Sequence, residues 1–216
     1  TTQTMPLAER QALIARCRQL NLPIVEDDPF GFILAQKSQN IPTLKQLDPL
    51  NVIYIGSLSE FSGADTRIGW LIAPPAIVAR LSDIRQEMEA GISIFSQYLA
   101  TELLKQPNLA ELVAQQQQQL AHARQRLLRL LAPFVAQGQV AYQTPTLGNT
   151  LWLHILTKHT MTRADYHVFL AQQLLVLPDF LFGHHSNHVR LSYSQLPADD
   201  TVLKSRLQAV MSQLMR

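Results

Sequence analysis

Apolar residues in the first hundred positions follow one helical pattern and three short continuous runs. Apolar side chains recur every three or four residues over 6–20, which predicts a helix. The runs at 24–25, 52–57 and 68–73 predict buried strands, and the latter two lack alternation, as in parallel-type strands covered on both faces. The stretch from 31 to 50 is rich in polar residues and proline, and predicts a loop.

Helical spacing then dominates from 76 to 136, with breaks near Gly91 and at 107–108. Five consecutive glutamines at 115–119 could form a low-complexity linker. Leucines flank this tract at helical spacing, so we predict a continuous helix with a solvated glutamine face.

Strands and helices alternate after Gly138. The expected strands cover 140–143, 150–156, 174–177 and 189–193, and the expected helices cover 162–173 and 197–214. We therefore predict an α/β chain in two parts. Residues 1–106 form an α/β part, and residues 107–216 form a compact α+β domain opened by a long helix.

Composition restricts the class of protein. The 216 residues are 47% hydrophobic and 16% charged, with a formal net charge of +2, which excludes global disorder and does not suggest a nucleic-acid surface. No apolar run is long enough to span a membrane, and no signal peptide is visible. The chain begins without an initiator methionine, and we interpret it as a fragment or a processed product.

Cysteine use points to a reducing compartment. The single cysteine, Cys17, excludes an internal disulfide and a cysteine-based zinc site. It lies on the apolar face of the first helix, so we expect it to be buried and inert. We expect a cytoplasmic protein.

Two polar segments follow predicted strands. Ser57, Ser59 and Arg67 supply hydroxyl and guanidinium donors beyond the second strand, where α/β sheets bind phosphorylated ligands. The alternative is a polar turn with a surface arginine. The acids at 26–28 could bind a metal, a ribose or a protonated ring nitrogen, or could be a solvated strand end or helix cap.

The histidines and tryptophans have simpler interpretations. His184, His185 and His188 are spaced like zinc ligands, but we interpret them as a loop and expect no metal site. We expect His154 to be a packing residue. Trp70 and Trp152 are core candidates.

Six segments in order resemble the fold-type I aminotransferases, most closely the aminotransferase-like domain of MocR-type regulators in the GntR family. The matching segments are 1–5, 24–30, 54–60, 67–74, 147–153 and 189–193. The resemblance implies the C-terminal part of a pyridoxal-phosphate-dependent transferase fold. A truncated, mostly parallel-sheet large domain, with an exposed apolar edge, would precede a small α+β domain. It also implies a homodimer and an upstream winged helix-turn-helix that binds DNA.

The resemblance assigns roles to individual residues. Asp27 would pair with the pyridine nitrogen of pyridoxal phosphate, which makes the ring an electron sink. Ser57, Ser59 and Arg67 would hold the phosphate. Arg190 would bind the α-carboxylate of a substrate or effector.

Two residues depart from the family pattern. Glu60 occupies the position of the lysine that forms the covalent link to the cofactor, and a carboxylate cannot form that link. The nearest lysines on either side that could substitute are Lys45 and Lys105, and neither is close in sequence. Phe30 stands where the family usually has a tyrosine, so the phenol that would bond the ring oxygen is missing. Any cofactor would therefore bind without a covalent link, or not at all.

The function we expect is the effector-binding and dimerisation domain of a GntR/MocR-type transcription regulator. A sensor need not turn over its ligand, so loss of the lysine is tolerable there. Its effector would be a small amino-acid-like or pyridoxal-type molecule. The alternatives are a degenerate or active class I aminotransferase acting on amino acids, and a cofactor-free interaction scaffold.

Overall fold

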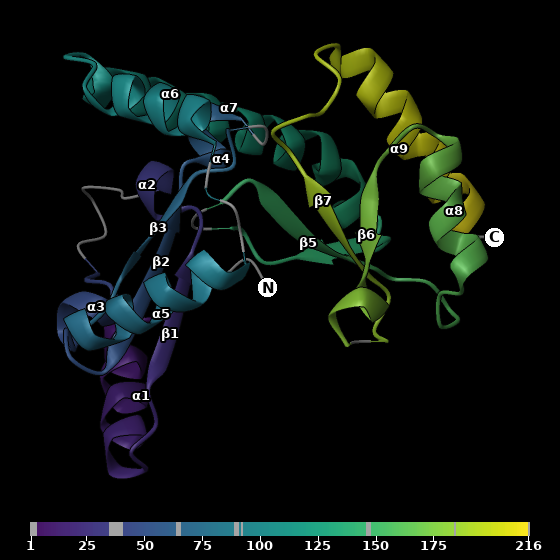
Figure 1. The fold of residues 1–216 in the computed structure, drawn as a ribbon. Coiled ribbons are helices and arrows are strands. Elements are labelled where there is room, and N and C mark those ends of the chain that lie inside the picture. The colour runs from purple at the N-terminus through teal and green to yellow at the C-terminus, as the bar shows by residue number, and fades with distance from the viewer. Residues whose placement is uncertain are drawn as a thin grey trace. The chain divides into compact units, whose positions relative to one another are not determined.

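The computed structural model describes residues 4–34, 41–63, 66–88, 91, 93–145, 148–183 and 185–215. The chain divides into two compact units (Figure 1). The first unit comprises residues 5–117, and the second comprises Thr4 and the residues from Gln118 onwards. The boundary lies inside a helix, whereas the change in sequence pattern suggests a boundary after residue 106.

The first unit contains a three-stranded sheet with the order β1-β2-β3. Its elements are α1 (Leu7–Gln19), β1 (Ile24–Asp28), α2 (Gly31–Leu34), α3 (Leu44–Leu47), β2 (Val52–Ser57), α4 (Ser59–Ser62), β3 (Gly69–Ile72), α5 (Pro75–Met88) and α6 (Ile94–Leu104). The predicted helices and strands are all present. The predicted loop at 31–50 contains two short helices, and β1 continues through the acids.

Strand pairing in the first unit is mixed. β1 runs parallel to β2, as expected, but β3 runs antiparallel to β2. The apolar run of β3 therefore does not indicate a parallel neighbour, because a parallel pair of strands can also carry an antiparallel edge strand.

One face of this sheet is covered and the other is open. Ile14, Ile24, Leu44 and Val52 form a small core in which α1 and α3 pack on β1 and β2. On the opposite face, Ile55 of β2 is 36% and Leu71 of β3 is 37% exposed. The prediction that these strands are covered on both faces is therefore wrong for the described residues, because side chains alternate and this small core lies on one face.

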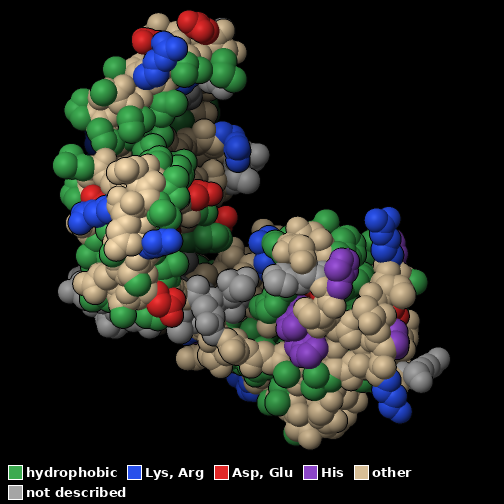
Figure 2. All heavy atoms as spheres, turned by 90° about the horizontal axis from the view of Figure 1, so that it is seen from below, with side chains coloured by type: hydrophobic (Ala, Val, Ile, Leu, Met, Phe, Trp, Pro, Cys, Tyr) green, Lys and Arg blue, Asp and Glu red, His purple; other side chains and the backbone are tan. Residues whose placement is uncertain are grey.

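The helices after the sheet also leave apolar side chains in solvent. Most of the described α5 side chains are exposed, and in α6 Ile94 is 84% and Phe95 74% exposed. Figure 2 shows hydrophobic side chains over the surface of the molecule. Large exposed apolar patches on folded proteins are commonly interaction sites.

The second unit contains a four-stranded antiparallel sheet with the order β4-β5-β7-β6. Its elements are α7 (Leu109–Ala136), which begins in the first unit, β4 (Val140–Tyr142), β5 (Thr150–Ile155), α8 (Arg163–Ala171), β6 (Val176–Pro178), the 3-10 helix η2 (Asp179–Phe182), β7 (His188–Ser192) and α9 (Asp200–Leu214). The continuous helix through the glutamine tract is confirmed. α9 starts at Asp200 rather than at 197, because the Asp199 carboxylate caps it by accepting from the Thr201 N–H.

The core of the second unit lies on one face of this sheet. Leu151, Leu153 and Ile155 of β5 are fully buried, and they pack with apolar side chains of α7, α8 and α9. The alternate residues Trp152 and His154 are on the opposite face and are partly exposed. The expectation that Trp152 is a core residue is therefore wrong, because strand alternation places it away from the helices.

Three smaller expectations can be compared with the structure. Trp70 is also only partly buried. Cys17 is half-buried rather than fully buried, and packs at the margin of the first unit's core. In the part of the chain that the structure describes, no helix is both long and apolar enough to cross a membrane.

Candidate functional site

The carboxyl ends of β1 and β2 bring together two residues that lie far apart in the sequence. The strands are parallel, with Asp27 opposite Ile55. Because side chains alternate, Asp27, Ile55 and Ser57 share one face of the sheet. Asp27 is exposed, and it has no hydrogen-bond or ion-pair partner among the described residues. Its carboxylate is thus available to a ligand at this edge.

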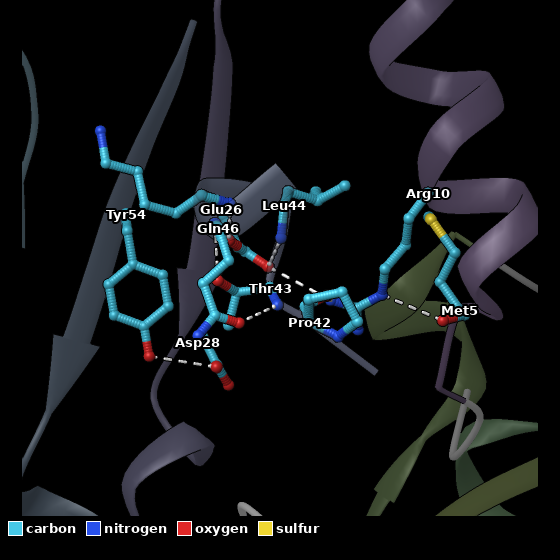
Figure 3. Close-up of polar contacts among 10 residues, drawn as sticks. Met5, Arg10, Glu26, Asp28, Pro42, Thr43, Leu44, Gln46 and Tyr54 are labelled. Atoms are coloured by element: carbon cyan, nitrogen blue, oxygen red, sulfur yellow. Dashed lines mark hydrogen bonds and ion pairs between the residues drawn. The ribbon is translucent and has the colours of Figure 1, made fainter. Parts of the chain in front are cut away.

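The neighbouring acids point to the other face and have structural partners. The Glu26 carboxylate accepts from the backbone N–H groups of Leu44 and Lys45, both at 2.9 Å, and from the Arg10 guanidinium at 3.5 Å. Figure 3 shows this cluster, and also the Tyr54 hydroxyl donating to Asp28 at 3.1 Å. Glu26 is therefore a helix cap, and only Asp27 of the three acids has the setting of a ligand-binding group.

The loop after β2 is organised by hydroxyls and a strained backbone. The Ser57 Oγ accepts from the Ser59 N–H at 3.1 Å, which turns the chain into α4. Arg67 is exposed and has a φ of 49°, a left-handed conformation that is uncommon outside glycine. Such strain is concentrated at binding loops. Phe30 is half-buried, just beyond the end of β1.

Glu60 lies in the first turn of α4, three residues after Ser57, and is exposed to solvent. Its backbone carbonyl accepts from the Gln116 side chain at 3.0 Å. Because Glu60 is exposed, its carboxylate does not incur the free-energy cost of burying a charged group.

The two lysines that flank this position in sequence have partners elsewhere. The Lys45 ammonium donates to the carbonyls of Pro49 at 2.6 Å and Val52 at 2.7 Å. Lys105 lies 3.6 Å from Glu102 in an exposed pair. Both ammonium groups therefore have other partners among the described residues. Lys37 lies outside the described residues.

These residues fit pyridoxal phosphate as a non-covalent ligand. The carboxylate of Asp27 suits a protonated ring nitrogen, while Ser57, Ser59 and Arg67 suit a phosphate. Glu60 does not fit a covalent link, because it has no amine. When bound, the cofactor would supply an electron-accepting ring.

Arg190 lies in the second unit, on β7, opposite Trp152 of β5. Its guanidinium carbon lies 5.1 Å from the centroid of the Phe182 ring. No carboxylate of the described residues forms an ion pair with this guanidinium. A half-buried guanidinium without an acid partner can bind an external carboxylate through two parallel hydrogen bonds.

The buried carboxylate of Asp179 connects two segments near Arg190. Asp179 is 1% exposed and accepts from the Tyr166 hydroxyl at 2.6 Å and from the backbone N–H groups of Ser186 at 2.6 Å and His188 at 3.2 Å. Burial alone would raise the pKa of Asp179, but these hydrogen bonds together lower it below its usual value. The carboxylate thereby ties η2 to the turn that leads into β7.

Of the predicted histidine group, the structure describes His185 and His188. No group of three or more metal-ligating side chains occurs among the described residues. His185 is exposed, His188 belongs to β7, and His184 lies outside the described part of the chain. The ring of His154 stacks on that of His188, with centroids 4.3 Å apart. Figure 2 shows several histidine side chains gathered on the surface.

Sequence reasoning missed Asp179, Phe182 and His188 as members of the Arg190 neighbourhood. Alternation within 188–192 would have placed His188 on the face of Arg190. The pairing with β5 and the fold of η2 have no comparable signal, because they depend on residues far apart in the chain.

The comparisons with known proteins can now be set beside this geometry. The family model described as aminotransferase class I and II matches residues 1–202. An uncharacterized HTH-type transcriptional regulator of Bacillus subtilis, YisV, is 30% identical over 203 residues, covering 93% of this chain and 41% of that protein. The HTH-type transcriptional regulator NorG of Staphylococcus aureus is 27% identical over 195 residues, covering 90% and 43%.

Solved structures share the fold. The α-aminoadipate aminotransferase LysN from Thermus thermophilus, complexed with N-(5'-phosphopyridoxyl)-L-leucine, has a TM-score of 0.84 at 24% identity, covering 97% of this chain and 54% of that one. The Pyrococcus horikoshii kynurenine aminotransferase has a TM-score of 0.86 at 21% identity, covering 100% and 54%. The chain thus spans about half of these enzymes and about two fifths of the regulators.

Proposed function

Because the chain belongs to the class I and II aminotransferase family, we propose that it is the effector-binding and dimerisation part of a GntR/MocR-type transcription regulator. The observation that supports this most is Glu60 in the first turn of α4, just after β2, at the position where transamination would require an amine. The two relatives described above are named HTH-type transcriptional regulators. Ligand binding without turnover is the activity that remains.

The ligand we propose is a small carboxylate of the amino-acid type, bound by Arg190. Its carboxylate would supply the missing acid partner of this half-buried guanidinium. Pyridoxal phosphate would bind non-covalently in the first unit. There Asp27 would hold a protonated ring nitrogen, and Ser57, Ser59 and Arg67 would hold the phosphate.

DNA recognition would belong to the part of the full-length protein outside this chain. The chain spans only about two fifths of regulators whose names specify a helix-turn-helix. The exposed apolar surface of α6 is suited to association with a second copy. As a regulator of transcription, the protein would act in the cytoplasm.

The proposal is tested by titrating the full-length protein with pyridoxal phosphate, followed by borohydride reduction and mass spectrometry. We expect saturable binding seen by absorbance, and no adduct after reduction, because residue 60 has no amine. A reduced adduct on a specific lysine would overturn the sensor proposal in favour of an enzyme. Absence of binding would leave a cofactor-free scaffold.

Replacing Arg67 with alanine should weaken pyridoxal phosphate binding by about 10- to 100-fold, because a charge-assisted contact to phosphate contributes about 1.5–3 kcal/mol. Calorimetry on the full-length protein measures the change. The Arg80→Ala variant removes the same charge from the exposed surface of α5 and should bind like the wild type. Unchanged affinity in Arg67→Ala would remove Arg67 from the phosphate site.

A further inference from the structure

We propose that the ligand of Arg190 has a planar conjugated ring beside its carboxylate, so that the effector is an aromatic amino acid or a close analogue. The inference rests on the proposed function, since it describes the same site in more detail. It comes from the side chains that surround Arg190 on the open face of the second unit's sheet.

Four rings form a connected aromatic surface on this face. The Trp152 ring lies 5.4 Å from that of Phe182, nearly perpendicular at 87°, and 5.3 Å from that of His188, nearly parallel at 14°. The His154 ring also stacks on the His188 ring, with an angle of 9° between them. All but one of these side chains are partly buried, and Phe182 is 41% exposed.

The surface is held in place by the protein. The His188 Nδ1 lies 2.8 Å from the Ser186 carbonyl oxygen and 3.0 Å from the Ser186 hydroxyl oxygen, and these two contacts orient the ring. Asp179 binds the backbone of Ser186 and His188 on one side and begins η2, which ends in Phe182, on the other. The rings therefore require little ordering when a ligand binds.

The charge of this face favours an anion. The residues of β5 and β7 that share it are Thr150, Trp152, His154, His188, Arg190 and Ser192, and none of them is acidic. The Arg190 guanidinium carbon lies 5.1 Å from the centroid of the Phe182 ring. Because Trp152 lies opposite Arg190 on the neighbouring strand, a carboxylate bound to this guanidinium would bring the rest of the ligand near Trp152.

The surrounding rings favour an aromatic ring on the ligand over an aliphatic group. An aliphatic side chain would gain from burial alone, whereas an aromatic ring gains further from edge-to-face or offset stacking with Trp152 and Phe182. Aromatic pairs of this type contribute enough to change affinity by about 3- to 10-fold.

The test compares L-phenylalanine with L-cyclohexylalanine, which has the same charged groups and a saturated ring of similar size. Calorimetry on the full-length protein should show L-phenylalanine binding about 3- to 10-fold more tightly. In Trp152→Leu this preference should fall to less than about twofold. Trp152→Phe, which keeps a ring, should retain most of it. Trp70→Leu removes a tryptophan from the first unit and should leave the preference unchanged.

The Arg190→Gln variant separates the two levels of the proposal. If both amino acids bind equally well and both lose affinity in Arg190→Gln, the ring preference is overturned and the carboxylate site stands. If Arg190→Gln leaves both affinities unchanged, or neither amino acid binds at millimolar concentration, the carboxylate site is overturned and the ring preference with it.

Discussion

Replacing Glu60 with lysine in the full-length protein is expected to convert non-covalent pyridoxal phosphate binding into a covalent link that borohydride traps in stoichiometric yield. A lysine amine at this position would condense with the aldehyde of the cofactor and release water. The chain has space for the longer side chain, because Glu60 is exposed in the first turn of α4. Absorbance and mass spectrometry of the reduced protein measure the link.

The matched control is Glu87→Lys, which makes the same charge change at an exposed position of α5. It should give no more adduct than the wild type. Equal labelling of both variants would show non-specific modification of surface amines. Binding without any adduct in Glu60→Lys would show that residue 60 does not face the aldehyde, and the assignment of this position would be wrong.

Replacing Asp179 with asparagine is expected to lower the free energy of unfolding by about 2–4 kcal/mol, since it removes a buried charged acceptor and leaves buried donors poorly satisfied. The affected donors are the Tyr166 hydroxyl and the backbone N–H groups of Ser186 and His188. Denaturant unfolding of the full-length protein at neutral pH measures the loss.

The direction of the Asp179 pKa shift predicts how this loss of stability depends on pH. The folded-state pKa of Asp179 lies below its usual value, so its contribution is complete above the unfolded-state pKa of about 3.9 and is lost as the pH falls through the folded-state value. The stability difference between wild type and Asp179→Asn should therefore shrink below about pH 4. The exposed Asp83→Asn should show neither effect. A difference that stays constant in acid would mean that asparagine disturbs packing rather than charge.

The candidate site in the first unit shows how much of a site residue patterns can predict. Sequence motifs singled out Asp27, Ser57, Arg67 and Glu60, and the observed register of β1 with β2 puts Asp27 and Ser57 on one face. The roles assigned to these residues stay predictions. Apart from the family resemblance, the residue pattern did not separate the three acids, because the partners of Glu26 come from α3 and α1, distant in the chain.

In the second unit, more of the candidate site depends on the tertiary structure than on the sequence pattern. Alternation predicted β5 correctly, but the expectation of a core Trp152 ignored the face on which α7, α8 and α9 would pack. Arg190 came from a motif, whereas its aromatic surroundings and the support from Asp179 came from strand pairing and the fold of η2.

The sequence by itself determined where most helices and strands form, that the chain is built on the aminotransferase pattern, and that residue 60 has no amine. These properties depend on residue identity and on periodicity over a few positions. Only the tertiary structure decided which sheet faces stay open, which acid caps a helix, and which rings surround Arg190. Those outcomes depend on the register between strands and on contacts between distant segments, and such contacts leave no local pattern in the sequence.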